Sequence, residues 1–363
     1  MAKADVQING AREFDIFTTD EARLLNQVVW RGELGAMEAY IDGLWTCPDL
    51  KALFIRLMKM NVGAQVRTWS DWLQSYLNRW INYQTVSRSR EVIDIHYNLG
   101  NTFYELLLGP SMQYSCALGR EDSNFNLTEA QERKMDLILR KLKLTPTCRV
   151  LDIGCGFGTL AYHLSEHCAQ VVGVTLSERQ FEWANRNFAR EIKTGKLLFI
   201  LSDYRKLPAD LGKFDRVVSV GFLEHVGVIN LPTFCDVVDR VLTDDGIACI
   251  HTIGKEENSQ VTSPFIRKYI FPHGQLPTPI DICSNFLKKF RLEDWHNFGK
   301  DYSKTLDAWY ENFKNCRFSD ERQNRIWELY LTSCSAAFAT RRIQLWQIVF
   351  TRKSSTQEYR SVR

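Results

Sequence analysis

The sequence predicts an α/β protein with a mostly parallel sheet and a helical N-terminal region. Two observations carry this prediction: short β-branched runs alternate with helix-length segments after about residue 91, and apolar residues before it recur at helical spacing. A chain of 363 residues with 45% hydrophobic residues can bury one large core and a smaller appendage. We therefore expect one domain over residues 1–90 and a larger one over residues 91–363.

The composition excludes several classes of protein. A net charge of +3 is too small to indicate a nucleic-acid partner. The chain has no apolar run of transmembrane length, and residues 1–17 lack the apolar core of a signal peptide, which together predict a cytoplasmic protein. Ten cysteines without a Cys-x-x-Cys pair indicate reduced thiols rather than disulfides or a metal site.

The most informative part of the N-terminal region is a helix predicted over residues 67–83. Its large apolar residues form one stripe, which includes Trp69, Trp72 and Trp80. A stripe of this kind is most often packed on a core. The same tryptophans, followed by the basic segment 87–90, also suit a helix at a membrane interface, so both interpretations stay open. Residues 87–90 are the candidate linker.

Seven runs are predicted to be strands. The first five alternate with helix-length segments, which indicates a parallel sheet with crossover helices. The last two are expected to extend this sheet at one edge, after an insertion over residues 255–287, and the tail after Lys353 is expected to be disordered. The predicted strands cover residues 148–154, 170–176, 196–203, 214–221, 246–254, 291–299 and 342–353.

A glycine-rich loop follows the first predicted strand. Gly154, Gly156 and Gly158 let backbone amides approach a ligand closely, and the start of the next helix favours an anionic group. The spacing is G-x-G-x-G, with Asp152 two positions before the first glycine, and not the G-x-G-x-x-G of dinucleotide-binding folds. This loop resembles the S-adenosylmethionine site of class I methyltransferases, which favours that cofactor over NAD.

Eight segments, one of which contains the glycine loop, occur in an order that makes the resemblance specific. Together they resemble the bacterial cyclopropane-fatty-acyl-phospholipid synthases, relatives of the mycolic acid cyclopropane synthases, over nearly the whole chain. The resemblance implies a Rossmann-like, mostly parallel seven-stranded sheet with a helical N-terminal domain that docks on lipid. The segments are residues 112–117, 150–158, 173–180, 219–227, 250–254, 268–277, 293–302 and 343–350.

The resemblance also implies which residues contact the cofactor. A ribose-binding fold usually has a carboxylate at the end of its second strand, but this sequence has Thr175 there. In the family, Thr175 and Gln180 would lie near the ribose and methionine portions. Asp203 would accept a hydrogen bond from the adenine amino group, although a helix cap is the alternative, and Tyr114 and Ser115 would close over the cofactor.

The implied reaction requires a base. Methyl transfer to a cis double bond leaves a carbocation, and loss of a proton from the transferred methyl closes a cyclopropane ring. The family is understood to use a bound bicarbonate ion for this purpose. The resemblance places that ion against Glu224, His251, Tyr302 and the main chains of Cys116 and Ile253.

Several nearby residues have simpler interpretations. His225 is expected to be structural because adjacent side chains after a strand diverge, and His251 by itself would be taken for a core histidine. Cys116 has no neighbouring basic residue to lower its pKa, so we expect it to position a ligand and not to act as a nucleophile. Cys334 is expected to pack in the core, and His296 receives no role.

The sequence therefore predicts a methyltransferase that builds a cyclopropane ring on an unsaturated phospholipid acyl chain. It would act in the cytoplasm, attached peripherally to the inner face of the membrane, and a homodimer is compatible with the family. Related lipid C-methyltransferases and small-molecule amine N-methyltransferases are the alternative enzymes. A catalytically silent lipid-binding protein is the alternative from another class.

Overall fold

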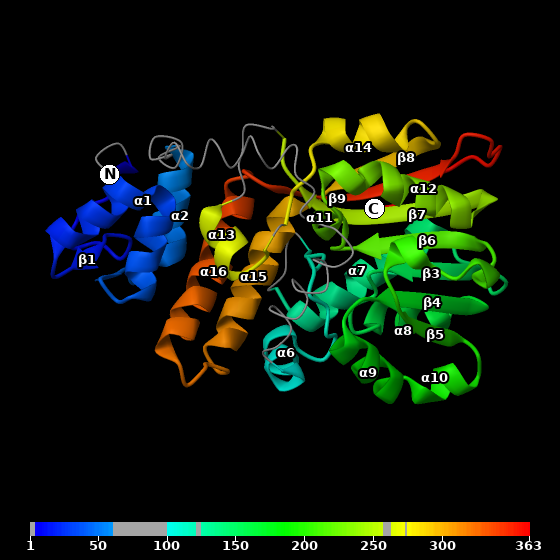
Figure 1. The fold of residues 1–363 in the computed structure, drawn as a ribbon, viewed down its shortest axis with the longest axis horizontal. Helices are drawn as coiled ribbons and strands as arrows, with labels where there is room; N and C mark the ends of the chain where they lie inside the picture. Colours follow the sequence, from blue (N-terminus) through cyan, green and yellow to red (C-terminus); the bar gives the residue numbers. More distant parts are fainter. Residues whose placement is uncertain (1–3, 61–99, 121–124, 257–262, 273) are drawn as a thin grey trace.

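The computed structural model describes residues 4–60, 100–120, 125–256, 263–272 and 274–363. Figure 1 shows a sheet at one end of the molecule, helices α1 and α2 at the other end, and helices α13, α15 and α16 between them. The predicted helix 67–83 with Trp69, Trp72 and Trp80, and the candidate linker 87–90, lie outside the described residues.

The N-terminal region begins with a short extended segment, and the helices that the sequence predicts follow it. Strands β1 (Phe17–Thr18) and β2 (Trp45–Thr46) pair with each other. Asp20 caps α1 (Glu21–Ile41) by accepting from the amide of Arg23, and Asp49 caps α2 (Leu50–Lys59) by accepting from the amide of Ala52. These caps satisfy amides that a helix start leaves unpaired.

The large sheet has seven strands in the order β5-β4-β3-β6-β7-β9-β8. Strands β3 to β7 are parallel, whereas β9 runs antiparallel between β7 and β8. The predicted fold class, all seven predicted strands and the extension at one edge are confirmed. The strands are β3 (Arg149–Ile153), β4 (Gln170–Thr175), β5 (Leu197–Leu201), β6 (Phe214–Val220), β7 (Leu242–Gly254), β8 (Phe290–Asn297) and β9 (Gln344–Arg352).

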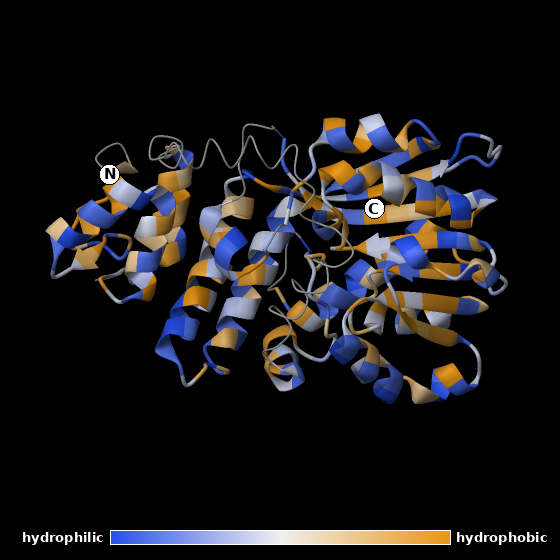
Figure 2. Ribbon diagram, in the orientation of Figure 1, coloured by the Kyte–Doolittle hydropathy of each residue, from blue (hydrophilic) through white to orange (hydrophobic). Residues whose placement is uncertain are grey.

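Helices cover both faces of this sheet. Side chains alternate between faces along a strand, so Val150 packs with α7, α8 and α9 on one side while Leu151 packs with α12 and α14 on the other. Figure 2 shows hydrophobic residues along the strands and mixed hydropathy on the covering helices. The helices are α7 (Leu127–Leu142), α8 (Thr159–Ser165), α9 (Glu178–Asn187), α10 (Ala189–Lys193), α11 (Leu223–Val226), α12 (Leu231–Val241) and α14 (Pro279–Phe286).

A separate hydrophobic cluster joins the N-terminal helices to the rest of the chain. Leu53 of α2 belongs to the same cluster as Tyr104 of α6 (Asn101–Leu108), Trp309 of α15 (Gly299–Phe313) and Trp327 of α16 (Glu321–Ala339). Buried Glu38 of α1 accepts from Lys268 Nζ at 2.7 Å, in α13 (Pro264–Tyr269). The N-terminal helices therefore pack on helices that lie between β7 and β9 in the sequence.

The tail after Lys353 was predicted to be disordered, and that prediction is wrong. The tail forms no helix or strand, but the Arg363 guanidinium donates to Asp294 Oδ2 at 2.6 Å and the Tyr359 hydroxyl donates to the carbonyl of Lys141 at 3.1 Å. The polar composition of the tail does not indicate these contacts, because their partners lie far away in the sequence. Among the described residues, no helix is long and apolar enough to cross a membrane.

Candidate active site

The predicted site residues gather where the parallel strands end. Asp152 lies on β3, Thr175 ends β4 and Asp203 follows β5, while Glu224 follows β6 and His251 lies on β7. The carboxyl ends of parallel strands share one edge of a sheet, which is where open α/β folds bind their ligands. This edge faces the helices of the N-terminal cluster in Figure 1.

The glycine loop has a conformation that only glycine adopts easily. Gly154, Gly156 and Gly158 have φ values of 82°, 57° and 80°. A Cβ atom on Gly154 would lie 2.5 Å from the Phe222 ring, and one on Gly158 would lie 2.6 Å from the Phe199 ring. Gly156 is different, because the nearest atom to its Cβ position would be Gln180 Nε2 at 3.9 Å. The loop is therefore packed at both ends and open in its middle.

Asp152 is buried beneath this loop, with 1% of its surface exposed. Its Oδ2 atom has no hydrogen-bond partner among the described residues. Burial raises the pKa of Asp152 to about 7, and the nearby charge of Lys134 opposes that rise.

Thr175 and Gln180 meet across the start of α9. The Thr175 hydroxyl donates to Gln180 Oε1 at 3.0 Å and accepts from the amide of Ser177 at 3.2 Å. Ser177 caps α9 by accepting from the amide of Gln180 at 3.3 Å. These bonds leave the Gln180 amide nitrogen beside Gly156. The structure thus brings the predicted cofactor residues of β3 and β4 together.

Asp203 has the helix-cap arrangement that the sequence left as the alternative. It caps a short 3₁₀ helix (Tyr204–Lys206) by accepting from the amide of Arg205 at 2.9 Å. Its two oxygens also accept from Arg205 Nε at 2.8 Å and Nη2 at 2.6 Å. Burial alone would raise the pKa of Asp203, but its hydrogen bonds with Arg205 hold it below the ordinary value. A cap and a ligand contact are compatible, because each carboxylate oxygen has more than one lone pair.

The segment that contains Tyr114 and Ser115 lies between α7 and the end of β6. The Tyr114 hydroxyl donates to the Tyr330 hydroxyl at 2.9 Å, and its ring lies 5.2 Å from that of Trp309. Ser115 is buried, and its Cβ atom is 3.8 Å from the position that a Cβ on Gly221 would take. This segment therefore reaches the strand that leads to Glu224.

Glu224 is held by one oxygen only. Oε1 accepts from the amide of Ile253 at 2.5 Å, whereas Oε2 has no partner among the described residues. The side chain is 7% exposed, and burial raises the pKa of Glu224 to about 7. An unpaired oxygen at this depth costs free energy unless a ligand supplies a hydrogen bond.

His251 has a similar unpaired atom. Gln347 Nε2 lies 3.3 Å from His251 Nδ1, and the two residues are direct partners in the register of β7 and β9. Since an amide nitrogen can only donate, Nδ1 accepts and the proton of the neutral ring lies on Nε2. That Nε2 atom has no partner among the described residues. Burial, assisted by the charges of Lys134 and Lys141, holds the pKa of His251 well below its ordinary value.

Tyr302 and Cys116 border the same space. Burial raises the pKa of the Tyr302 hydroxyl well above its ordinary value, and nearby Cys116 and Glu224 raise it further. The Tyr302 ring stacks on Phe338 at 4.5 Å. Cys116 is fully buried, and burial likewise raises its pKa, which keeps the thiol protonated. A protonated thiol is a weak nucleophile.

The remaining residues from the sequence analysis lie around this space. His225 is exposed, and its ring meets Phe271 edge-on at 5.7 Å. His296 is half-buried with its ring 4.9 Å from Phe298. Cys334 packs against the cluster of α15 and α16, and burial raises its pKa to about 12.

Sequence reasoning missed Gln131, Lys134 and Gln347, which contact site residues from α7 and β9. A signal for each was available. Lys134 lies at a core-facing position of α7, beside apolar Leu137 and Ile138, and Gln347 interrupts an apolar strand. Polar residues at such positions are buried and therefore need partners.

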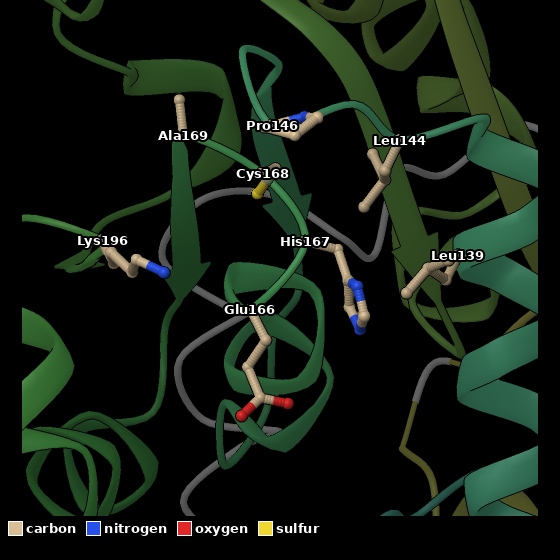
Figure 3. Close-up of a pocket in the computed structure, with 8 residues that line it drawn as sticks. All are labelled: Leu139, Leu144, Pro146, Glu166, His167, Cys168, Ala169 and Lys196. Carbon is tan, nitrogen blue, oxygen red and sulfur yellow. The ribbon is translucent and has the colours of Figure 1, made fainter.

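A pocket of about 510 Å³ lies at the opposite edge of the sheet. Figure 3 shows residues from the segments that lead into β3, β4 and β5 around it. It is lined by Leu139, Leu144, Pro146, Glu166, His167, Cys168, Ala169 and Lys196. Because these residues precede the strands, the pocket is separate from the candidate active site.

Comparison with known proteins gives consistent relatives. The family model for mycolic acid cyclopropane synthetase matches residues 84–348. The chain is 41% identical to the cyclopropane-fatty-acyl-phospholipid synthase of Escherichia coli (strain K12) over 360 residues, which covers 97% of this chain and 91% of that protein. The cyclopropane synthase MmaA2 from Mycobacterium tuberculosis is 30% identical, with a TM-score of 0.67 over 72% of this chain and 98% of the other.

A further solved relative was determined with ligands bound. The mycolic acid cyclopropane synthase CmaA1, complexed with SAH and CTAB, is 28% identical and gives a TM-score of 0.65 over 72% of this chain and 98% of the other.

Proposed function

The chain belongs to the mycolic acid cyclopropane synthetase family and is an S-adenosylmethionine-dependent methyltransferase, and we propose that it is a cyclopropane-fatty-acyl-phospholipid synthase. In this role it transfers a methylene group from S-adenosylmethionine to the cis double bond of an unsaturated phospholipid acyl chain. The observation that supports this reaction best is the pair of buried, unpaired atoms, Glu224 Oε2 and His251 Nε2, at the carboxyl edge of the sheet.

The glycine loop and its neighbours fit the cofactor. The loop is open at Gly156, where Gln180 Nε2 lies nearby, and the unpaired Oδ2 of Asp152 lies beneath it. The proposed set is completed by Gly154, Gly158 and residues of the adjoining segments. These are Thr175 for the ribose, Asp203 for adenine, and Tyr114 and Ser115 over the bound molecule.

The unpaired atoms on the other side fit a small oxyanion such as bicarbonate. His251 Nε2 offers a proton, and Glu224 Oε2 either accepts a hydrogen bond or, when protonated, donates one. Tyr302 and the main chain at Cys116 complete the proposed set. The amide of Ile253 already donates to Glu224, so we assign Ile253 to orienting that carboxyl group.

Bound S-adenosylmethionine supplies an electrophilic methyl group, and bound bicarbonate supplies a base for the proton that ring closure releases. The chain itself must orient the alkene and tolerate a cation without attacking it. The rings of Trp309 and Phe271 each adjoin the ring of Tyr114 beside the site, and aromatic faces stabilise positive charge. The buried, protonated thiol of Cys116 is a poor nucleophile toward the same cation.

The lipid substrate places the enzyme at a membrane surface. We propose that residues 1–90 form a domain that docks peripherally on the cytoplasmic face of the bilayer, ahead of a catalytic domain over residues 91–363. A homodimer is the assembly that the family resemblance favours. Sedimentation with anionic and neutral vesicles tests the docking, and light scattering tests the assembly.

Product analysis tests the reaction. Purified protein is incubated with S-adenosylmethionine and vesicles of monounsaturated phospholipid, with and without bicarbonate. A mass gain of one CH₂, loss of the alkene signal and new cyclopropane protons are expected, with faster turnover when bicarbonate is present. The same mass gain with an alkene or a branched methyl would identify a lipid C-methyltransferase instead. Methylation of amines alone would identify an N-methyltransferase, and cofactor binding without turnover would identify a silent lipid-binding protein.

A further inference from the structure

Helix α7 carries a lysine whose side chain is fully buried beneath the candidate site. Lys134 is 0% exposed, and the neighbouring buried residues of the helix include apolar Ala130, Leu137 and Ile138. Burial of an ammonium group costs free energy unless hydrogen bonds and opposite charge compensate. The contacts of Lys134 therefore indicate what the residue does.

Those contacts hold the segment that precedes Cys116. The Lys134 ammonium donates to Gln113 Oε1 and, at 3.0 Å, to Ser115 Oγ. Gln131, one turn earlier on the same face of α7, donates to the carbonyl of Ser115 at 2.9 Å and to that of Gln113 at 3.4 Å. Two side chains of one helix thus hold the side chains and the carbonyl groups of Gln113 and Ser115.

Lys134 also interacts electrostatically with titratable groups of the site, although burial lowers the pKa of Lys134 to about 7. Its positive charge opposes the rise in the pKa of Asp152 and lowers the pKa of His251. The thiol of Cys116 lies in the same field. Asp152 and Ser115 belong to the proposed cofactor set, whereas His251 belongs to the proposed bicarbonate set.

We propose that Lys134 is a positioning residue: its hydrogen bonds fix Gln113 and Ser115, so that the site has its cofactor-binding shape before the cofactor arrives. This inference rests on the proposed function for the identity of the ligand. It predicts that replacing Lys134 weakens cofactor binding through the loss of its hydrogen bonds to Gln113 and Ser115, and not through destabilisation of α7.

The test compares two buried lysines of the same helix. Lys134→Met is expected to weaken the binding of S-adenosylhomocysteine roughly tenfold or more, measured by calorimetry on the full chain, because hydrogen bonds to a charged group are lost. Lys141→Met is the matched control, since Lys141 is equally buried but pairs with Asp294 at 3.1 Å, away from the cofactor residues. It is expected to leave the affinity unchanged even if the protein unfolds at a lower temperature.

Two further variants keep the inference testable if Lys134→Met fails to fold. Gln113→Leu removes one acceptor of the lysine and leaves the charge in place, so a smaller loss of affinity is expected. In a Gln113→Leu background, adding Lys134→Met is expected to reduce affinity less than it does alone, because the two side chains are hydrogen-bonded partners. Unchanged affinity in Lys134→Met, or equal losses in Lys134→Met and Lys141→Met, would overturn the inference. Failure of the proposed reaction is distinguishable, because it would leave these affinities intact while no cyclopropane forms.

Discussion

The two halves of the candidate active site differ in how their polar groups are satisfied. On the side of β4 and β5, Thr175 bonds to Gln180, and both oxygens of Asp203 bond to Arg205. On the side of β6 and β7, Glu224 Oε2 and His251 Nε2 have no partner among the described residues. Asp152 is the exception on the first side, with its own unpaired oxygen.

This difference indicates two ways of preparing a binding site. Polar groups that hydrogen-bond to one another fix the shape of a pocket at little cost in folding free energy. A large ligand can then form further hydrogen bonds to the lone pairs that these groups still have free. Buried groups without partners store an unfavourable free energy that a small polar ligand removes on binding. The first arrangement suits the cofactor, and the second suits an ion that must be held at one place. Mutations on the two sides should therefore affect different steps.

The largest effect is expected for Glu224→Gln. The amide keeps the shape of the side chain but cannot carry the negative charge or the titrating proton of the acid. Turnover is expected to fall about a thousandfold, as for the loss of a group that supports proton transfer, while S-adenosylhomocysteine affinity is unchanged. Product formation and calorimetry measure the two quantities. Turnover at the wild-type rate by this variant, without added bicarbonate, would show that Glu224 does not help to hold the base.

The same variant sharpens the comparison through its stability. The pKa of Glu224 rises from 4.5 in the unfolded chain to about 7 in the folded protein. As pH rises through this interval the unfolded state releases the proton first, so stability contributed by the protonated form is lost. Relative to Glu224→Gln, the wild type should lose about 3 kcal/mol of unfolding free energy across this interval. Urea unfolding at several pH values measures the difference, and parallel curves for the two proteins would contradict it.

A smaller effect is expected on the cofactor side from Gly158→Ala. The added Cβ would lie 2.6 Å from the Phe199 ring at a φ of 80°, so the loop and the ring must shift. Unfolding free energy should fall by about 2 kcal/mol. Gly156→Ala is the control: its φ of 57° also strains the backbone, but its nearest neighbour would be 3.9 Å away, so it should lose less stability than Gly158→Ala while cofactor affinity falls. Equal losses of unfolding free energy in the two variants would show that the space around Gly156 does not make it more tolerant of a side chain than Gly158.

The smallest effect is expected for Gln347→Met. This change removes the group beside His251 Nδ1 and leaves an apolar side chain of similar length. The imidazole loses the bond that fixes its orientation and its proton, so turnover should fall about tenfold with unchanged cofactor affinity. Steady-state kinetics at saturating bicarbonate measure the loss. If this variant weakens cofactor binding instead, Gln347 supports the cofactor-binding half of the site.

Much of this arrangement is predictable from the sequence because its signals are local. Runs such as residues 170–176 contain enough β-branched side chains to mark a strand, and the glycine loop marks where a ligand approaches. The position of β9 between β7 and β8 has no local signal, because strand pairing depends on residues far apart in the chain. The pairing of His251 with Gln347 and the burial of Lys134 have the same origin.

The place of β9 in the sheet has a consequence for how the enzyme is made. A ribosome releases the chain from its N-terminus, so β3 to β7 emerge well before Gln344–Arg352. The cofactor side depends on strands that are already available at that stage, whereas His251 meets Gln347 only after β9 has entered beside β7. The half of the site that contains His251 is thus completed last during synthesis. A nascent chain that stops short of β9 lacks Gln347, which orients the imidazole of His251.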